Sequence, residues 1–373
     1  MRCGSCWRAS CVHPARFPHP PPLDGVRMPV AFHIDIRPVA SWSDADWRDW
    51  HELNQSLNEG HPLLHARFLR AALRHFGHPE VLGIRASDSC GTQLLALAQR
   101  HSRGLFELFT PPQAPYGPLL LKATDTQAAH ALLRATLRSL PPPAYRWHLY
   151  HQNSAWPSAK HVPDWMDRRA TMQVEAAGNF DDYWRRPRPV DAVERHIRRL
   201  KKRNLSPQLK VICRSDQIEE AIDAHALLET SGWKGRQASA IVRGTAAGDF
   251  YRELLGAYAA DGCAYAYQLT LADRVVASQL ALVGGRHLAL LKTAYDEQYR
   301  QYGPGRLLDF FMLQHVFANL PGSLVDFCNI ATPEDLRWAT ARSTLMTGAV
   351  YHNDALRVMA GVARSVLRPW RGR

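Results

Sequence analysis

The hydrophobic positions follow two periods along this chain. Apolar residues recur at every second position in some stretches, which predicts strands, and at every third or fourth in others, which predicts helices. From residue 33 the predicted order is strand, two helices, three strands, loop, helix and strand. These elements are expected at His33–Pro38, Asp44–Leu57, Leu64–Phe76, Glu80–Ala86, Gln93–Gln99, Gly104–Thr110, Thr126–Ser139 and Tyr145–His151.

The second half of the chain repeats this order after two further helices, Phe180–Trp184 and Val190–Asn204. Its elements are expected at Leu209–Arg214, Asp216–Ser231, Phe250–Ala260, Tyr265–Thr270, Val275–Leu282, His287–Lys292, Arg306–Asn319 and Leu324–Cys328, followed by a helix at Pro333–Ser343 and a strand at Gly348–His352. Tyr-Gly-Pro occurs after the third strand of each meander, at residues 116–118 and 302–304. The repetition predicts an α/β fold built from an internal duplication.

The composition shows a large excess of basic over acidic residues. Among 373 residues, 46 Lys and Arg stand against 34 Asp and Glu, a net charge of +12. This charge suits an anionic partner such as CoA, an acidic polymer, nucleic acid or a membrane face. No run approaches the ~18 apolar residues of a membrane-spanning helix. Residues 1–27 are rich in Cys, Arg, His and Pro and have no apolar core. We expect a disordered tail or translated upstream sequence there, with Met28 as the true start.

The seven cysteines do not predict a metal or thiol site. Cys3 and Cys6 have CxxC spacing, but no second pair follows. Four others are scattered singly, at positions 90, 213, 263 and 328, which suits a reducing compartment. We therefore expect no metal.

One glycine-rich turn carries the clearest chemical signal. Arg300-Gln301-Tyr302-Gly303-Pro304-Gly305 lies between a predicted strand and a predicted helix. Backbone N–H groups at such a turn, together with the helix N-terminus, bind phosphate groups. The spacing is neither the dinucleotide pattern Gly-x-Gly-x-x-Gly nor a P-loop.

This turn resembles the acyl-CoA loop of the GNAT superfamily. Residues 180–352 are similar to the acetyltransferase domain of CelD-type cellulose and exopolysaccharide biosynthesis proteins, which are relatives of the FemABX transferases. The matching features are the basic helix Arg195–Lys202, Glu229 with Trp233-Lys234-Gly235, the meander, Tyr295-Asp296 before the glycine turn, and Asp326-Phe327. The chain departs from the family at Arg337-Trp338, where Tyr-Lys is more usual.

The resemblance implies two tandem GNAT-like domains, each a mixed, twisted sheet flanked by helices. We expect the first at residues 28–170, without a cofactor loop, the second at 171–355, and a basic tail at 356–373. The implied activity is direct transfer of an acyl group, in the first instance acetyl, from acyl-CoA to an amine or hydroxyl of a sugar or cell-envelope precursor. The alternatives are a FemABX-like aminoacyl transfer and a non-catalytic partner of a polysaccharide-synthesis complex.

The site residues are predicted in four groups. Phosphate binding is expected from Arg300, Gln301, Tyr302, Gly303, Gly305 and Arg306. A backbone N–H around Leu291 to Thr293 would polarise the thioester carbonyl. The proton acceptor is left open among Asp326, Glu229 and Asp296, with His287 and His315 as generic candidates. Trp233 and Lys234 are expected to contact the acceptor substrate.

The basic run Arg195–Arg203 has several possible partners. It suits the CoA 3′-phosphate, a polyanionic glycan or anionic lipid. Nucleic acid is unlikely, since the chain has no RNA-binding signature and no zinc-finger spacing. The predicted location is cytoplasmic, with peripheral attachment to the inner membrane or a synthase complex as a further option.

Overall fold

The computed structural model describes residues 32–111, 113–123, 125–161, 166–185, 190–231 and 240–367. The side chains of residues 190, 191 and 364–367 are also outside the description. Trp233 and Lys234, the predicted acceptor contacts, lie outside these ranges.

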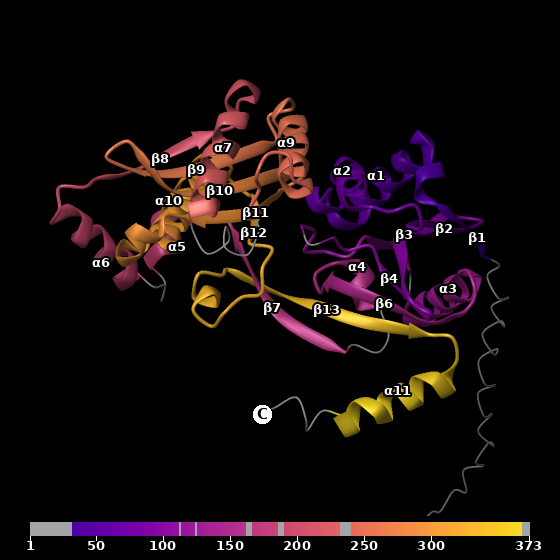
Figure 1. Cartoon of the computed structure of the whole chain (residues 1–373). Helices are drawn as coiled ribbons and strands as arrows, with labels where there is room; N and C mark the ends of the chain where they lie inside the picture. Colours follow the sequence, from indigo (N-terminus) through magenta and orange to yellow (C-terminus); the bar gives the residue numbers. More distant parts are fainter. Residues whose placement is uncertain are drawn as a thin grey trace, which may run out of the picture. The chain divides into compact units, whose positions relative to one another are not determined.

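The first half of the fold runs from residue 33 to residue 153 (Figure 1). Its elements are β1 (His33–Pro38), α1 (Asp44–Asn58), α2 (Ala66–Phe76), β2 (Leu82–Asp88), β3 (Gly91–Ser102), β4 (Gly104–Leu108), β5 (Leu119–Leu121), α3 (Thr126–Ser139) and β6 (Ala144–Asn153). The 3₁₀ turns η1 (Val39–Ser41) and η2 (Pro62–Leu64) flank α1. Three elements and a basic helix connect the halves: α4 (Pro157–Lys160), β7 (Asp167–Glu175), α5 (Phe180–Arg185) and α6 (Val190–Lys201).

The second half, residues 207 to 326, repeats the order of the first. Its elements are β8 (Pro207–Ile212), α7 (Ser215–Ser231), α9 (Ala246–Ala259), β9 (Ala264–Leu271), β10 (Arg274–Gly284), β11 (His287–Tyr295), the 3₁₀ helix η3 (Glu297–Tyr302), α10 (Pro304–Asn319) and β12 (Leu324–Asp326). The chain continues through η4 (Asp335–Arg337), β13 (Ala341–Tyr351) and α11 (Asp354–Leu367). Both halves therefore contain a strand, two helices, a three-stranded meander, a helix and a further strand.

One mixed sheet of 13 strands contains both halves. Its order is β1-β2-β3-β4-β6-β13-β7-β12-β11-β10-β9-β8, with β5 paired to β3. The final strand of each half is parallel to its meander: β6 to β4, and β12 to β11. β13 pairs antiparallel with both β6 and β7 and so joins the halves. The expected mixed α/β fold is confirmed.

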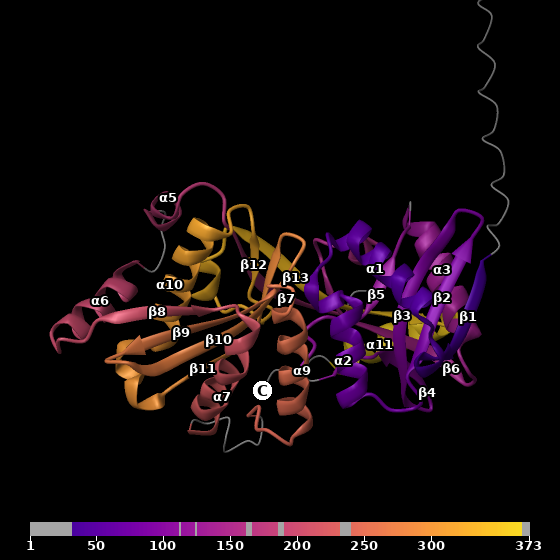
Figure 2. The same ribbon diagram turned by 90° about the horizontal axis from the view of Figure 1, so that it is seen from above.

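Helices cover the sheet of the second half on both sides. Figure 2 shows α10 on one side of β8–β11 and α7 and α9 on the other. The helices of the two halves also meet, because α2 packs on α9. Phe68 lies edge-on to Phe250 with ring centroids 5.7 Å apart, and Arg67 forms a 2.6 Å ion pair with Asp261. The buried cluster of Trp50, Phe68 and Phe250 thus draws on both halves.

The end of the chain differs from the prediction. The prediction of a helix at Pro333–Ser343 is wrong, because η4 is a single turn and β13 begins at Ala341. Asp335 accepts hydrogen bonds from the backbone and hydroxyl of Thr332, which closes that turn locally. Beyond it, pairing with β6 and β7 holds residues 341–351 extended, so tertiary pairing decides the conformation. The sequence interpretation also overlooked β7, which lies across residue 170, where a domain boundary was expected.

Candidate functional site

Two strands of the second half separate at the centre of the sheet. β11 and β12 are paired only from His287–Ala289 to Leu324–Asp326, although β11 continues to Tyr295. A β-bulge lies just past this point, since Leu280 pairs with Lys292 and Ala281 with Leu290. Bulges of this kind re-aim side chains beside functional sites. The bulged residue is Leu291, within the stretch where a carbonyl-polarising N–H was expected.

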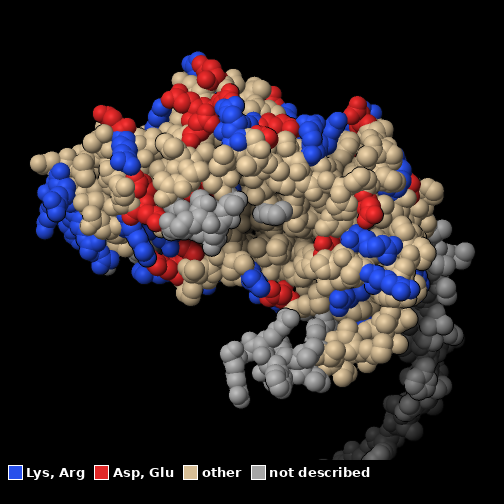
Figure 3. Space-filling view, viewed as in Figure 1, with Lys and Arg blue, Asp and Glu red and all other residues tan. Residues whose placement is uncertain are grey.

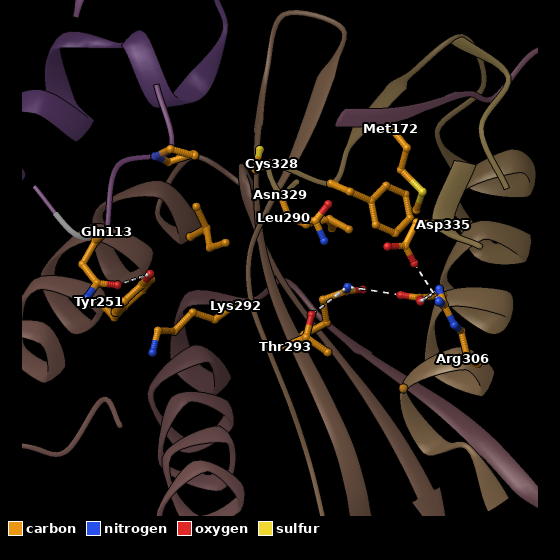
Figure 4. Close-up of a pocket in the computed structure, with 16 residues that line it drawn as sticks. Gln113, Met172, Tyr251, Leu290, Lys292, Thr293, Arg306, Cys328, Asn329 and Asp335 are labelled. Carbon is orange, nitrogen blue, oxygen red and sulfur yellow. Dashed lines mark hydrogen bonds and ion pairs between the residues drawn. The ribbon is translucent and has the colours of Figure 1, made fainter. Parts of the chain in front are cut away.

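A cavity of about 620 Å³ occupies this separation (Figure 4). Lys292 and Thr293 are consecutive on β11 and therefore point to opposite faces of the sheet. Both nevertheless line the cavity. Gly305 and Arg306 line it on the α10 side, and Tyr251 and Gln113 on the α9 side. The cavity therefore passes through the sheet and is accessible to groups on both faces.

The first turn of α10 presents its N-terminus to the cavity. Gly303 is the N-cap, with a φ of 59° and no side chain to bond the first amides. A Cβ placed on Gly305 would meet no heavy atom nearer than 4.0 Å, so there is open space beside its N–H. Uncapped amides and the helix dipole favour an anion at this position.

Polar side chains surround this turn. Gln279 donates to the Thr293 hydroxyl at 3.0 Å and to Asp309 at 3.4 Å. Burial raises the pKa of Asp309 to about 6. Arg306 donates to Asp335 at 2.6 Å, and the hydrogen bonds of Asp335 keep its own pKa below the usual value despite its burial. Figure 4 shows these interactions on one side of the cavity.

The predicted phosphate loop divides into two parts. Gly305 and Arg306 line the cavity, whereas Arg300, Gln301 and Tyr302 form η3 and Gly303 caps it. These four residues lie beside α6 instead: Arg199 donates to the Gln301 carbonyl at 3.1 Å, and a Cβ on Gly303 would come within 2.5 Å of His196 Nε2. The structure therefore places the basic helix against the turn that leads into α10. Figure 3 shows Lys and Arg gathered at the end of the molecule where Figure 1 places α6.

On the α9 side, a buried ion pair lies behind the cavity wall. Lys292 Nζ is 3.0 and 3.2 Å from the two carboxylate oxygens of Glu229. Glu229 also accepts the N–H of Ile241 at 3.0 Å, and His225 Nε2 is 3.7 Å away. Glu229 does not itself line the cavity but contacts a residue that does. On the same side, Tyr251 donates to Gln113 at 3.0 Å.

Asp326 is fully buried at the end of β12 and does not line this cavity. Tyr116 and Gln173 donate to its Oδ2 at 2.5 and 3.0 Å, and the Cys328 N–H donates to its Oδ1 at 2.8 Å. His61 Nε2 lies 3.6 Å from the same carboxylate. Burial alone would raise the pKa of Asp326, but these partners, with His61 first among them, lower it.

The remaining predicted carboxylate, Asp296, lies away from the cavity. It caps η3 by accepting the Gln298 N–H at 2.9 Å and forms a 2.7 Å ion pair with Arg274. The structure therefore does not bring Asp326, Glu229 and Asp296 together around one point.

A second cavity of about 370 Å³ adjoins the first. The two share Pro115, Cys328 and Asn329 as a common rim. Its walls include Pro111, Ile330 and Leu345, and its polar groups include Asp167 and Arg169, which form a 2.7 Å ion pair. Cys328 has a φ of 52°, a conformation that costs energy for a residue with a side chain.

Sequence reasoning missed several residues of the first cavity. They are Gln113, Tyr251, Gln279, Lys292, Asp309 and Asp335. They form no motif and come from six separate parts of the chain. A usable signal was present for two of them, because Lys292 and Asp309 are single charges inside otherwise apolar runs. Within the described residues, no group of three or more His, Cys, Asp or Glu is arranged to hold a metal ion.

Part of the chain matches a known protein family. Residues 191–334 match the family model described as an acetyltransferase (GNAT) domain. The protein is therefore an acyltransferase enzyme with a GNAT domain in its second half, and GNAT domains use acyl-CoA. No curated protein matches the chain. The finer CelD-type relationship stays a prediction.

Solved structures agree on the fold across both halves. FemX is 13% identical and covers 84% of this chain and 98% of its own, with a TM-score of 0.51. The C-terminal domain of an Agrobacterium fabrum protein, assigned as a lysylphosphatidylglycerol synthetase, is 10% identical, covers 87% and 98%, and has a TM-score of 0.53. A Bacteroides thetaiotaomicron protein of unknown function is 10% identical, covers 86% and 99%, and has a TM-score of 0.51. At these identities the likeness shows the fold alone.

Proposed function

We propose that the protein transfers an acyl group from acyl-CoA directly to an amine or hydroxyl of a sugar or cell-envelope precursor. The observation that carries the proposal is the cavity between the separated strands β11 and β12, with the N-terminus of α10 at its edge. Two reactants that approach from opposite faces of the sheet would meet in it. Holding them in line supplies much of the catalytic effect.

The donor would lie on the α10 side. Its pyrophosphate would accept hydrogen bonds from the N–H groups of Gly305 and Arg306, and α6 would supply positive charge nearby. The thioester would extend along β11 toward the bulge at Leu291. A main-chain N–H there would stabilise negative charge on the carbonyl oxygen during attack.

The acceptor would enter by the second cavity and cross the rim formed by Pro115, Cys328 and Asn329. Apolar walls with an Asp167–Arg169 pair suit a ring with hydroxyl groups, because the pair offers both acceptors and donors. Attack forms the new amide or ester bond and breaks the C–S bond. The proton of the acceptor would pass to the Lys292–Glu229 pair and finally to the CoA sulfur. Of the three predicted catalytic carboxylates, Glu229 is therefore the one that we retain as proton acceptor.

Thermal unfolding with acetyl-CoA and with free CoA tests the donor site. Binding to the folded state should raise the melting temperature. Gly305→Asp should abolish the shift, since a carboxylate at that position would repel the phosphates. Gly256→Asp is a matched control, because that glycine of α9 also has open space around its Cβ position. An equal shift for Gly305→Asp and the parent would overturn the donor site.

Release of the CoA thiol tests the reaction itself. We expect glucosamine to accelerate release from acetyl-CoA above the rate in water, and Arg169→Ala to raise the KM for the acceptor. Arg168→Ala is the control, because Arg168 neighbours Arg169 on β7 but does not line the second cavity. A rate that no amine or hydroxyl acceptor changes would contradict the proposal.

A further inference from the structure

α11 exposes apolar side chains along one side. Val358, Met359 and Val362 are 58, 59 and 58% exposed, at a spacing that places them on one face of the helix. They are three of the seven large hydrophobic residues that are exposed in the described part of the chain. In the sequence, Val366 continues the same spacing. A scattered exposed residue needs no explanation, but a row of them marks an interaction surface.

The sequence of α11 and of the residues that follow it has a net positive charge. Residues 354–373 contain five arginines, one aspartate, and neither lysine nor glutamate, which gives a net charge of +4. The one carboxylate, Asp354, is neutralised within the fold, since Arg134 lies 2.5 Å and Arg357 3.4 Å from its Oδ1. Figure 3 shows the part of α11 turned to the viewer as mainly uncharged, with Lys and Arg on the adjoining surface.

The net positive charge of residues 354–373 distinguishes between two possible partners of α11, a second copy of the chain and a lipid bilayer. A second copy of the chain would bring two such helices, each carrying this excess of arginine, against one another. Three side chains also cover far less than the roughly 800 Å² that each partner buries in a stable interface. A bilayer with anionic headgroups needs no matching protein surface. It accepts an apolar face at the headgroup boundary and attracts nearby arginines.

We infer that α11 is a membrane-surface helix that binds anionic phospholipid bilayers through Val358, Met359 and Val362, assisted by Arg357 and by the net positive charge that the sequence of residues 354–373 carries. The helix would lie in the plane of the interface. No helix among the described residues is long and apolar enough to cross a membrane.

Sedimentation of the full chain with sucrose-loaded vesicles tests this inference. We expect binding to vesicles of equal phosphatidylglycerol and phosphatidylcholine, and little binding to phosphatidylcholine alone. Binding should weaken as salt screens the charges. The triple variant Val358→Ser, Met359→Ser, Val362→Ser should reduce the partition coefficient at least about tenfold, since it removes the buried apolar area.

Two controls separate this surface from others. Leu227→Ser removes an apolar side chain on α7 that is also exposed and should leave vesicle binding unchanged. Replacing Arg195 and Arg198 of α6 by Ala should lower binding less than the triple variant does. Vesicle binding is compared only among variants whose melting temperature matches that of the parent.

Equal sedimentation of the parent and the triple variant would overturn the inference. So would a concentration-dependent dimer, seen by light scattering, that the triple variant loses. The assay contains no acyl-CoA, so its outcome is independent of the proposed reaction.

Discussion

The phenol oxygen of Tyr116 lies 2.5 Å from the carboxylate of Asp326. Tyr116 belongs to the first half and Asp326 ends β12 in the second, so this hydrogen bond joins the halves inside the protein. Asp326 also accepts the N–H of Cys328, which shapes the rim shared by the two cavities. A carboxylate whose pKa is lowered binds a proton weakly and is therefore a poor proton acceptor. The geometry favours a positioning role for Asp326.

Tyr116→Phe should destabilise the protein by roughly 1.5–3 kcal/mol, because it removes a hydrogen bond to a buried charged group. Urea unfolding at neutral pH measures this change. Tyr145→Phe, at a side chain that is 54% exposed, should change stability by less than about 0.5 kcal/mol. If both variants unfold at the urea concentration of the parent, the Tyr116 bond contributes nothing.

Glu229 and Lys292 form a buried pair whose members depend on each other. Glu229→Gln should cost about 3–5 kcal/mol, because the Lys292 ammonium would remain buried without its counter-charge. Glu229→Gln combined with Lys292→Met should recover part of that loss. Chemical unfolding of the two single variants and the double variant gives the coupling energy. Additive effects would contradict the mutual dependence of the pair.

The raised pKa of Asp309 predicts that the stability of the folded protein depends on pH. Burial raises its pKa to about 6 in the folded protein, from a reference value of 3.8. The folded state therefore binds this proton more tightly than the unfolded state. The stability that Asp309 contributes is fully present below about pH 4 and is lost as the pH rises through about 6.

Asp309→Asn removes this titration. The variant should gain up to about 3 kcal/mol relative to the parent above pH 7, since one pKa unit corresponds to ~1.36 kcal/mol. Near pH 4 the two proteins should have similar stability. Unfolding curves for both proteins across this range provide the test, and a difference that does not vary with pH would rule out a raised pKa.

Asp335 restrains a cation beside the predicted phosphate site. Because Arg306 is paired to Asp335 at 2.6 Å, part of its charge is unavailable to a ligand. Asp335→Asn should strengthen CoA binding by roughly three- to tenfold at low salt, and less at high salt. Calorimetric titration measures the affinity. Asp273→Asn makes the same change in net charge in the turn between β9 and β10, away from the cavity, and should leave the affinity near that of the parent.

The alternating and helical periods predicted most of the fold. The meander of β9, β10 and β11 was found because its strands are apolar runs divided by short turns. Ala272 and Asp273 lie between β9 and β10, and Gly284 ends β10 before Gly285. Only the end of β13 was found in this way, as the strand expected at Gly348–His352, whereas its first residues were expected to be helical. Its backbone is held by strands more than 150 residues earlier in the chain, and no local pattern encodes those partners.

The sequence could point to cavity-lining residues only where they are neighbours in the chain. Gly305 and Arg306 are adjacent and lie on the cavity. Asp326 lies in the strand expected at Leu324–Cys328 and ends the shorter β12, but its hydrogen-bond partner Tyr116 belongs to the other half. Lys292 and Glu229 are separated by 63 residues, so only the folded structure shows that they form a pair.

β13 has a consequence for how this chain can be divided. It comes from the C-terminal side of the sequence but completes the hydrogen bonding of β6, which belongs to the N-terminal side. A protein cut near residue 170 would give an N-terminal fragment with an open sheet edge. In the C-terminal fragment, β13 would lose β6 and part of β7, because the cut divides β7. We expect neither piece to be soluble alone and the two to recover the native form only when produced together.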